Sequence, residues 1–187
     1  MEITWDTDLE LDLWRDICQD SLYWFIRVAY GMDFQPPRAS KWFTPRIHKP
    51  ICDWFTKHAK EWLDKRNGLN LMLVVPRYFG KTTIITICGQ AWLHCNDTEL
   101  STYSGSESIG QTQEMFTEPM KKILDGSDPY GWFTYLWGNW YAKDREWRRE
   151  YSTHAARRGV GRKEPSLGTW GVEKGITGRH PDAGFLD

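Results

Sequence analysis

The sequence lacks any long apolar run. Its longest strongly apolar stretch, "LMLVV" at 71–75, is far shorter than the roughly 20 residues that a membrane-spanning helix needs. The N-terminal stretch "MEITWDTDLELDLW" is acidic and has no apolar region of the kind found in secretory signal peptides. We therefore expect no contact with a membrane and a location in the cytoplasm.

An excess of charge of either sign is also missing. The 24 Lys and Arg residues nearly balance the 25 Asp and Glu residues, which gives a formal net charge of -1. This balance excludes a general polyanion-binding surface, so any contact with nucleic acid must come from a local patch. With 40% hydrophobic and 26% charged residues among 187, the composition is typical of a globular protein with one sizeable core.

Paired cysteine motifs are absent. The four cysteines are Cys18, Cys52, Cys88 and Cys95, and none forms a C-x-x-C pair. Because Cys88 and Cys95 fall within one predicted helix, buried free thiols in a reducing compartment are favoured over two disulfides, the alternative for a secreted chain. The sequence also has no zinc cluster, no Ser/His/Asp triad and no convincing dinucleotide-binding G-x-G-x-x-G motif.

The first 66 residues are predicted to be helical. The apolar face of a first helix repeats at three- and four-residue steps and comprises Trp14, Ile17, Cys18, Leu22, Phe25 and Ala29. A second helix is expected to begin with Thr44 as N-cap and Pro45 in its first turn, and to end near "RNG" at 66–68. Its predicted apolar face is Ile47, Ile51, Trp54, Phe55, His58 and Trp62. Pro50 is expected to kink this helix or to delay its start.

After Gly68 the pattern changes to strands that alternate with helices, which predicts an α/β fold with a parallel sheet flanked by helices. Residues 69–75, "LNLMLVV", form a short continuous apolar run, as expected of a strand covered on both faces. A helix from residue 81, a strand within 99–106, a helix over 107–124 and a final buried strand within 182–187 are predicted to follow. We therefore expect two parts, a helical segment over 1–66 and an α/β core over 67–187.

One tripeptide in this core has the residues of a phosphate-binding site. Gly80, Lys81 and Thr82 match the end of the P-loop pattern G-x-x-x-x-G-K-[ST], but Val75 stands where the first glycine belongs. The tripeptide follows the predicted strand and opens a helix, where free backbone N–H groups favour an anion. Lys81 would contact the terminal phosphates of a nucleotide, and the Thr82 hydroxyl would bind Mg²⁺. The alternative is that Thr82 caps a core helix and Lys81 is solvated.

The stretch "PRYFGKTT" at 76–83 resembles the deviant P-loop of phage terminase large subunits, the ATPases that pump viral DNA into empty capsids. The resemblance implies a P-loop ATPase fold and assigns nucleotide binding to Pro76, Arg77, Tyr78, Phe79, Gly80, Lys81, Thr82 and Thr83. Arg77 stands where that family commonly has an arginine, and its planar charged group suits a phosphoryl-transfer transition state. Residues 43–63 resemble the family's helix ahead of the loop, which implies an adenine contact for His48.

The end of the sequence carries a second resemblance to the same family. "SLGTWGVEKGITGRHPDAGFLD" at 166–187 is similar to the approach to the family's second nucleotide motif, which makes Asp187 the Walker B aspartate. A carboxylate at the end of a buried strand beside the P-loop can hold Mg²⁺, so Asp187 joins Arg77 and Lys81 as an expected catalytic residue. Asp182 is the competing candidate, but it precedes the apolar residues. Because the family's catalytic acid follows this aspartate, we expect an ATPase core that is incomplete at its C-terminus.

The function that the resemblance implies is an ATPase subunit, or a fragment of one, that uses Mg·ATP to drive double-stranded DNA into a procapsid. The implied partners are double-stranded DNA, the portal protein, the small terminase subunit and further copies of the chain in a ring, all in the host cytoplasm. Two alternatives stay open. One is another P-loop enzyme, such as a helicase-like translocase or a nucleic-acid kinase. The other is a non-hydrolysing module that docks on a portal or partner subunit.

A basic cluster within 144–163 is the candidate DNA contact. It carries Arg145, Arg148, Arg149, Arg157, Arg158, Arg162 and Lys163, interleaved with Trp147 and Tyr151. Such a cluster can follow a DNA backbone by neutralising phosphates. The expected contacts are Arg148, Arg149, Arg157 and Arg158. The alternative is a solvated charged hairpin, since Asp144, Glu146 and Glu150 neutralise much of the charge.

Overall fold

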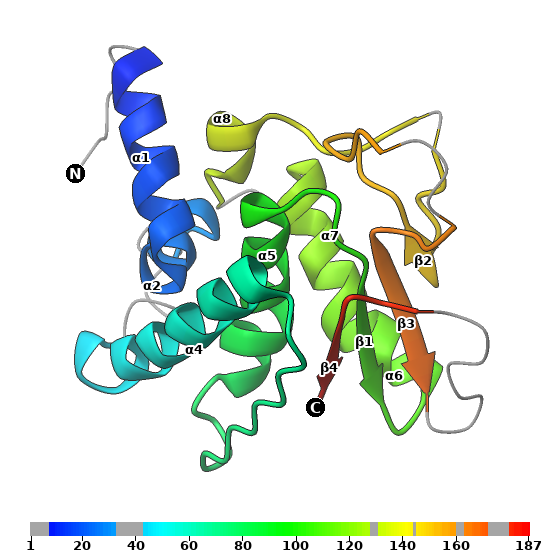
Figure 1. Ribbon diagram of the computed structural model, residues 1–187, viewed down its shortest axis with the longest axis horizontal. Helices are drawn as coiled ribbons and strands as arrows, with labels where there is room; N and C mark the ends of the chain where they lie inside the picture. The colour runs from blue at the N-terminus through cyan, green and yellow to red at the C-terminus, as the bar shows by residue number, and fades with distance from the viewer. Residues whose placement is uncertain (1–7, 33–42, 128–130, 144, 160–162, 172–179) are drawn as a thin grey trace.

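Helices and one sheet make up the computed structural model, which describes residues 8–32, 43–127, 131–143, 145–159, 163–171 and 180–187. In this part of the chain, helices flank a sheet with the strand order β2-β3-β1-β4 (Figure 1). The strands are β1 (Thr102–Ser106), β2 (Tyr151–Ser152), β3 (Leu167–Gly171) and β4 (Ala183–Leu186). The predicted α/β class is confirmed.

The sheet is mixed rather than fully parallel. β1 pairs in parallel with β3 on one side and with β4 on the other, as the alternation of strands and helices predicts. β2 pairs antiparallel with β3, so the expected all-parallel sheet is wrong at this edge. The described residues between β2 and β3 contain no helix, and parallel neighbours need a long crossover connection, usually helical.

The N-terminal part is helical within the described residues. α1 (Asp8–Asp20) is followed by α2 (Leu22–Trp24) and by the π-helix η1 (Phe25–Ala29). Between α1 and α2, the Ser21 side chain accepts a hydrogen bond from the Trp24 backbone N–H, which stabilises the start of α2 as an N-cap. The predicted apolar face is confirmed at its fully buried members, Cys18, Leu22, Phe25 and Ala29.

The helix α4 (Pro45–Lys65) begins and ends as predicted. Thr44 is its N-cap and Pro45 its first residue, and Arg66 terminates it in the left-handed conformation at φ 51°. The helix continues through Pro50, so its start is not delayed.

The buried face of α4 differs from the predicted one. It comprises His48, Cys52, Phe55 and Ala59, whereas Ile47 is 42% exposed. Trp54 and Trp62 are only partly buried. The prediction is therefore wrong at Ile47, since the buried face of α4 runs through His48 and Cys52 rather than through Ile47.

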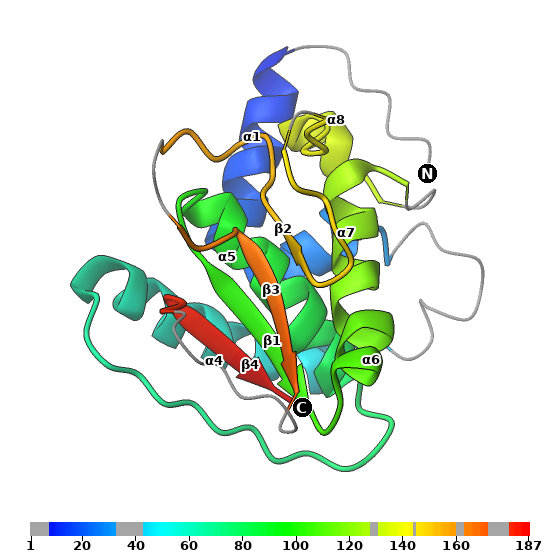
Figure 2. The ribbon, with the colours of Figure 1, turned by 90° about the vertical axis from the view of Figure 1, so that its right-hand side faces the viewer.

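Two helical stretches follow the loop and β1. The first is η2 (Thr82–Gly89) with α5 (Gln90–Asn96), and the second is α6 (Ile109–Thr112), η3 (Gln113–Thr117) and α7 (Glu118–Asp125), before α8 (Phe133–Trp137). They confirm the helices predicted from residue 81 and over 107–124. Figure 2 shows the sheet in front of α5 and α7. Within the described ranges, none of the helices combines the length and the apolar character needed to cross a membrane.

Residues 69–75 are not a strand. They connect α4 to the loop without any strand assignment, and Met72 is 84% and Val74 78% exposed. The predicted strand, covered on both faces, is therefore wrong. An apolar run becomes a strand only where a neighbour satisfies its backbone groups, and these residues do not pair with β4, the last strand of the sheet order.

One hydrophobic core extends from α1 to β4. Trp92 is fully buried in it, and its indole N–H donates a 2.9 Å hydrogen bond to the backbone carbonyl of Cys18. All four cysteines are buried free thiols, as predicted, and burial raises the pKa of Cys18 and of Cys52 to about 12. Residues on both sides of the expected boundary after residue 66 share this core, and the division into two parts stays a prediction.

Two glycines in the β1–β3 pair make room for aromatic rings. Tyr103 lies opposite Gly168, and Trp170 lies opposite Gly105. A Cβ atom on either glycine would overlap the ring across from it. Each ring therefore covers the backbone of its partner glycine, and these two cross-strand pairs fix the register between β1 and β3.

Gly168→Ala is expected to destabilise the protein by about 1–3 kcal/mol, because the added methyl group must displace the Tyr103 ring in a packed layer. Gly184→Ala on β4 is the matched control, since nothing lies within 4 Å of an added Cβ there. The control should be neutral or stabilise by up to about 1 kcal/mol. Urea unfolding measures both variants, and equal stabilities would contradict the role of the ring.

Candidate functional site

The loop at 76–81 joins residues 69–75 to η2. Its backbone passes through two residues with positive φ, Tyr78 at 70° and Gly80 at 68°. Glycine adopts this conformation at little cost, whereas a tyrosine there is strained. The Gly80 carbonyl accepts a 2.8 Å hydrogen bond from the Ile84 N–H. The helical turn therefore begins at the glycine and places Lys81 at the helix start.

Lys81 and Asp187, two of the predicted catalytic residues, are in contact. The Lys81 ammonium forms an ion pair with one oxygen of the Asp187 carboxylate, and the Thr86 hydroxyl donates a 3.4 Å hydrogen bond to the other. Asp187 directly follows β4, and its N–H donates to the Gly105 carbonyl at 3.3 Å. The parallel pairing of β4 with β1 thus brings the carboxylate to the helix start, although the two residues lie 106 positions apart.

The surroundings of Asp187 suit a cation. Its side chain is only 9% exposed, while that of Lys81 is 45% exposed, so solvent screens the carboxylate less than the ammonium. Carboxylate and hydroxyl oxygens are ligands that Mg²⁺ takes together with phosphate oxygens and water. Among the described residues, no group of three or more His, Cys, Asp or Glu side chains could hold a metal by itself. The residues therefore fit Mg²⁺ that arrives with a phosphate ligand.

Thr86, rather than Thr82, contacts the carboxylate. Thr82 is partly buried, and no hydrogen bond within the described ranges joins it to Asp187, the partner that Thr86 has. Thr86 lies one helical turn further along and is 4% exposed. Side chains four residues apart share a helix face, and this spacing is the signal by which Thr86 could have been found from the sequence.

The other loop residues differ in exposure. Pro76, Arg77 and Tyr78 are exposed, Tyr78 to 98%. Phe79 and Thr83 are partly buried. Within the described ranges, no hydrogen bond or ion pair joins Arg77 to Asp187, as one joins Lys81 to it, and the role of Arg77 at the phosphates stays a prediction.

His48 packs in the core at the start of α4. Its Nδ1 accepts a 2.8 Å hydrogen bond from the Thr44 N–H, and its ring stacks on Phe43 with centroids 5.1 Å apart. Burial lowers the pKa of His48, an effect that a hydrogen bond with the Thr44 backbone opposes. Because the side chain is 3% exposed, an adenine contact would require the ring to leave this packing.

Asp182, the competing candidate, lies at the other end of β4. Its carboxylate accepts a 2.7 Å hydrogen bond from the Ser101 N–H, and its own N–H donates to the Ser101 carbonyl at 2.8 Å. These bonds hold the start of β4 against the start of β1. The geometry therefore separates Asp182 from Lys81 and favours Asp187 as the metal-binding carboxylate.

An open groove of about 440 Å³ lies between β4, α4 and residues 69–73. Lys81 and Asp187 belong to its lining. Its apolar lining includes Trp54, Phe55, Trp62, Ile85, Leu93 and Phe185. The ion pair thus borders a space of the size that small-molecule ligands occupy.

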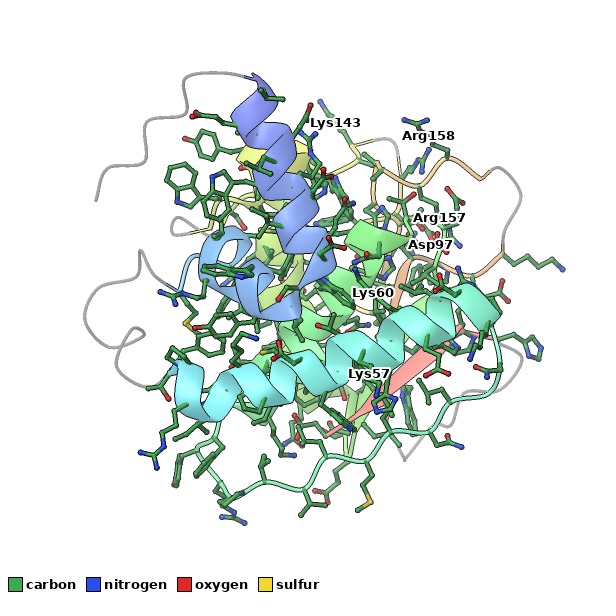
Figure 3. All side chains as sticks on the ribbon, turned by 60° about the vertical axis from the view of Figure 1, so that its left-hand side comes forward. Lys57, Lys60, Asp97, Lys143, Arg157 and Arg158 are labelled. Carbon is green, nitrogen blue, oxygen red and sulfur yellow. The ribbon has the colours of Figure 1, made fainter. Side chains whose placement is uncertain are left out.

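Arg157, one of the predicted DNA contacts, belongs to the core. It is 2% exposed, and its guanidinium donates to the backbone carbonyls of Glu164 at 2.7 Å and Glu99 at 3.2 Å. Figure 3 shows Arg158 at the outer rim of the molecule and Arg157 further inward. A DNA contact by Arg157 would require the guanidinium to leave these backbone carbonyls, and the contact stays a prediction.

The surface arginines among the predicted DNA contacts are Arg148, Arg149 and Arg158. Arg148 donates to the Tyr151 hydroxyl at 3.1 Å and lies 3.6 Å from the Glu146 carboxylate. Part of its charge is thus neutralised, as expected for a solvated hairpin. Arg162 and Asp144 lie outside the described residues, and DNA binding by this surface stays a prediction.

Comparison with known proteins gives no relative: no family model, curated protein or solved structure significantly matches the chain. The resemblance to terminase large subunits therefore rests on short motifs and stays an expectation. The geometry adds one observation to it. The lysine of the first motif and the aspartate of the second meet in space.

A second group of polar side chains is buried between α5, β1 and the segment after β2. The His94 ring bonds to the Thr102 hydroxyl at 2.8 Å and to the His154 ring at 3.1 Å. Gln90 donates to the same hydroxyl at 2.6 Å. Burial lowers the pKa of His94 to about 3 and that of His154 to about 2. No spacing in the sequence marks this pair.

The free energy of unfolding is expected to fall as the pH drops below about 6.5, the pKa of an unfolded histidine. His94 and His154 have depressed pKa values in the folded state, so the unfolded state binds more protons between about pH 6.5 and pH 3. His154→Gln should reduce the dependence of the unfolding free energy on pH by up to about 1.4 kcal/mol per pH unit.

Urea unfolding at pH 7, 6, 5 and 4 measures the effect. His58→Gln, at a partly exposed position on α4, is the control. Equal slopes for the wild type and His154→Gln would contradict the assignment.

Proposed function

We propose that the chain binds Mg·ATP beside the groove, between the loop at 76–83 and Asp187, as the ATPase part of a DNA-packaging motor of the terminase type. The observation that carries the proposal is the ion pair between Lys81 and Asp187. A P-loop enzyme needs both groups on one nucleotide, a lysine for the phosphates and a carboxylate for the metal. Their contact across 106 positions supports a common site.

The ion pair occupies the place that the proposal gives to the phosphates and the metal. Bound Mg·ATP supplies a new partner to each side, phosphate oxygens to the ammonium and Mg²⁺ to the carboxylate. Lys81 is half exposed and can move toward a ligand. The Thr86 hydroxyl bonds to the second carboxylate oxygen and keeps Asp187 in position during the exchange.

The loop backbone supplies a favourable place for an anion. The first N–H groups of η2 have no carbonyl partner within the helix, and the helix dipole adds positive potential at its start. Gly80, at φ 68°, presents no side chain to an approaching phosphate. Arg77 is exposed three residues before Gly80, and its role in the proposal is to reach the terminal phosphate once nucleotide is bound.

Coupling to double-stranded DNA is the further part of the proposal. The exposed arginines Arg148, Arg149 and Arg158 supply charge for a contact with the phosphate backbone, which carries no sequence information. The portal protein, the small terminase subunit and further copies in a ring are the partners of such a motor.

Lys81→Ala is expected to weaken Mg·ATP binding roughly 10- to 150-fold, since a charge-assisted hydrogen bond contributes about 1.5–3 kcal/mol. Titration calorimetry in one buffer compares it with the wild type. Lys57→Ala is the control, because Lys57 is exposed on α4 and lies outside the lining of the groove. Absent binding by the folded wild-type protein, or equal binding by Lys81→Ala, would remove the nucleotide site.

Asp187→Asn is expected to abolish the effect of Mg²⁺ on ATP affinity. The substitution removes the metal-binding carboxylate and also the group that competes with phosphate for Lys81. In EDTA the variant should therefore bind ATP more tightly than the wild type, whereas added Mg²⁺ should improve only the wild type. Asp64→Asn, on the exposed side of α4, is the control. An unchanged Mg²⁺ effect in Asp187→Asn would contradict the assignment.

A further inference from the structure

The turn after β1 carries a carboxylate close to Asp187. Glu107 directly follows β1, as Asp187 directly follows β4. β1 and β4 are parallel neighbours with Gly105 opposite Leu186, and the Asp187 N–H donates to the Gly105 carbonyl at 3.3 Å. Figures 1 and 2 both show the two strands ending at the same edge of the sheet. Two carboxylates thus follow adjacent strands at one edge.

This edge is also where the Lys81 ammonium meets the Asp187 carboxylate. The register places Ser106 opposite Asp187, so Glu107 is one residue beyond that position. Neighbouring strands lie about 4.8 Å apart. A ligand bound at Asp187 is therefore within reach of a glutamate side chain on the next strand, either directly or through one water.

The backbone of the turn is held on both sides of Glu107. The hydroxyls of Ser106 and Thr112 are buried and lie 2.8 Å apart. The Thr112 hydroxyl is also 3.1 Å from the Trp170 carbonyl on β3, and the Thr112 N–H donates to the Ser108 carbonyl at 3.1 Å. Ser108 is in turn the N-cap of α6. These contacts fix the position from which the Glu107 side chain extends.

The Glu107 side chain itself is available to a ligand. It is exposed, and within the described ranges it takes part in no hydrogen bond or ion pair. The Asp187 carboxylate, by contrast, already contacts Lys81 and Thr86. A catalytic base must reach the reacting water with its own position held by the surrounding structure. Glu107 combines a fixed backbone with a free carboxylate.

We propose that Glu107 is the catalytic base of the ATPase and that its carboxylate binds the water that attacks the terminal phosphate. This inference rests on the proposed function, which places Mg·ATP between Lys81 and Asp187. The water oxygen forms a bond to the terminal phosphorus as the bond from that phosphorus to the bridging oxygen of ADP breaks. Glu107 accepts a proton from the water and releases it to solvent when ADP and phosphate leave.

The two carboxylates then have separate tasks. Asp187 holds the metal, whose charge makes this carboxylate a poor proton acceptor, and Glu107 takes the proton. In the terminase family the catalytic acid follows the aspartate of the second motif on the same strand, whereas Glu107 supplies the carboxylate from the neighbouring strand.

Single-turnover hydrolysis of Mg·ATP by the full chain tests the proposal, and calorimetry with a non-hydrolysable ATP analogue measures binding on the same samples. Glu107→Gln keeps the size of the side chain but cannot accept the proton. It is expected to lower the rate of hydrolysis at least about 100-fold and to change the Kd for the analogue less than about threefold. Glu114→Gln, at an exposed position on η3, is the matched control and should keep the wild-type rate.

The two measurements separate this proposal from the nucleotide site. Hydrolysis by Glu107→Gln at the wild-type rate would overturn the assignment and leave the nucleotide site standing. The same conclusion would follow if the wild type bound the analogue but did not hydrolyse ATP. A loss of analogue binding as large as the loss of rate would show that Glu107 acts in binding, and it would overturn the role as base. Absence of binding by the folded wild type would overturn both proposals.

Discussion

The parallel pairing of β4 with β1 is the contact on which the candidate site depends. It aligns Ala183 with Thr102 and Leu186 with Gly105, and this register brings Asp187 to Lys81 at the start of η2. A slip of one residue would turn the carboxylate to the other face of the sheet. The two hydrogen bonds between Asp182 and Ser101 oppose such a slip.

Several features that cost free energy lie near the candidate site. Among the described strands β4 is paired on one side only, Met72 and Val74 are exposed, and Tyr78 has a positive φ. Each of these costs free energy, and elements that move with a ligand come from the less stable parts of a fold. The core that carries the site is by contrast closely packed, with Trp92 and the His94–His154 pair fully buried.

Local signals in the sequence predicted much of the fold. Thr44 and Pro45 marked the start of α4, and the apolar residues before Asp187 marked β4. Residues 69–75 were assigned wrongly because an apolar run does not show whether a partner strand is present. The predicted buried face of α4 differs from the observed one because periodicity gives only the approximate direction of burial. His48 and Cys52, which are buried, were not included in the predicted face.

The candidate site was likewise predicted only in part from the sequence. The motifs predicted Lys81 and Asp187, which the structure brings together, but a motif does not fix where an exposed loop residue such as Arg77 points. Thr86 was missed because its role depends on contact with a residue 101 positions away. The burial of Arg157 was missed because the sequence shows charge, whereas packing decides whether an arginine meets solvent or backbone carbonyls.

A double-mutant cycle on Mg·ATP binding tests the central claim, that Lys81 and Asp187 act on one nucleotide. Calorimetry would give the binding free energy of the wild type, Lys81→Gln, Asp187→Asn and the double variant. The account predicts a coupling energy of at least about 1 kcal/mol, as for residues in one network. Additivity within about 0.3–0.5 kcal/mol, the behaviour of independent sites, would contradict it.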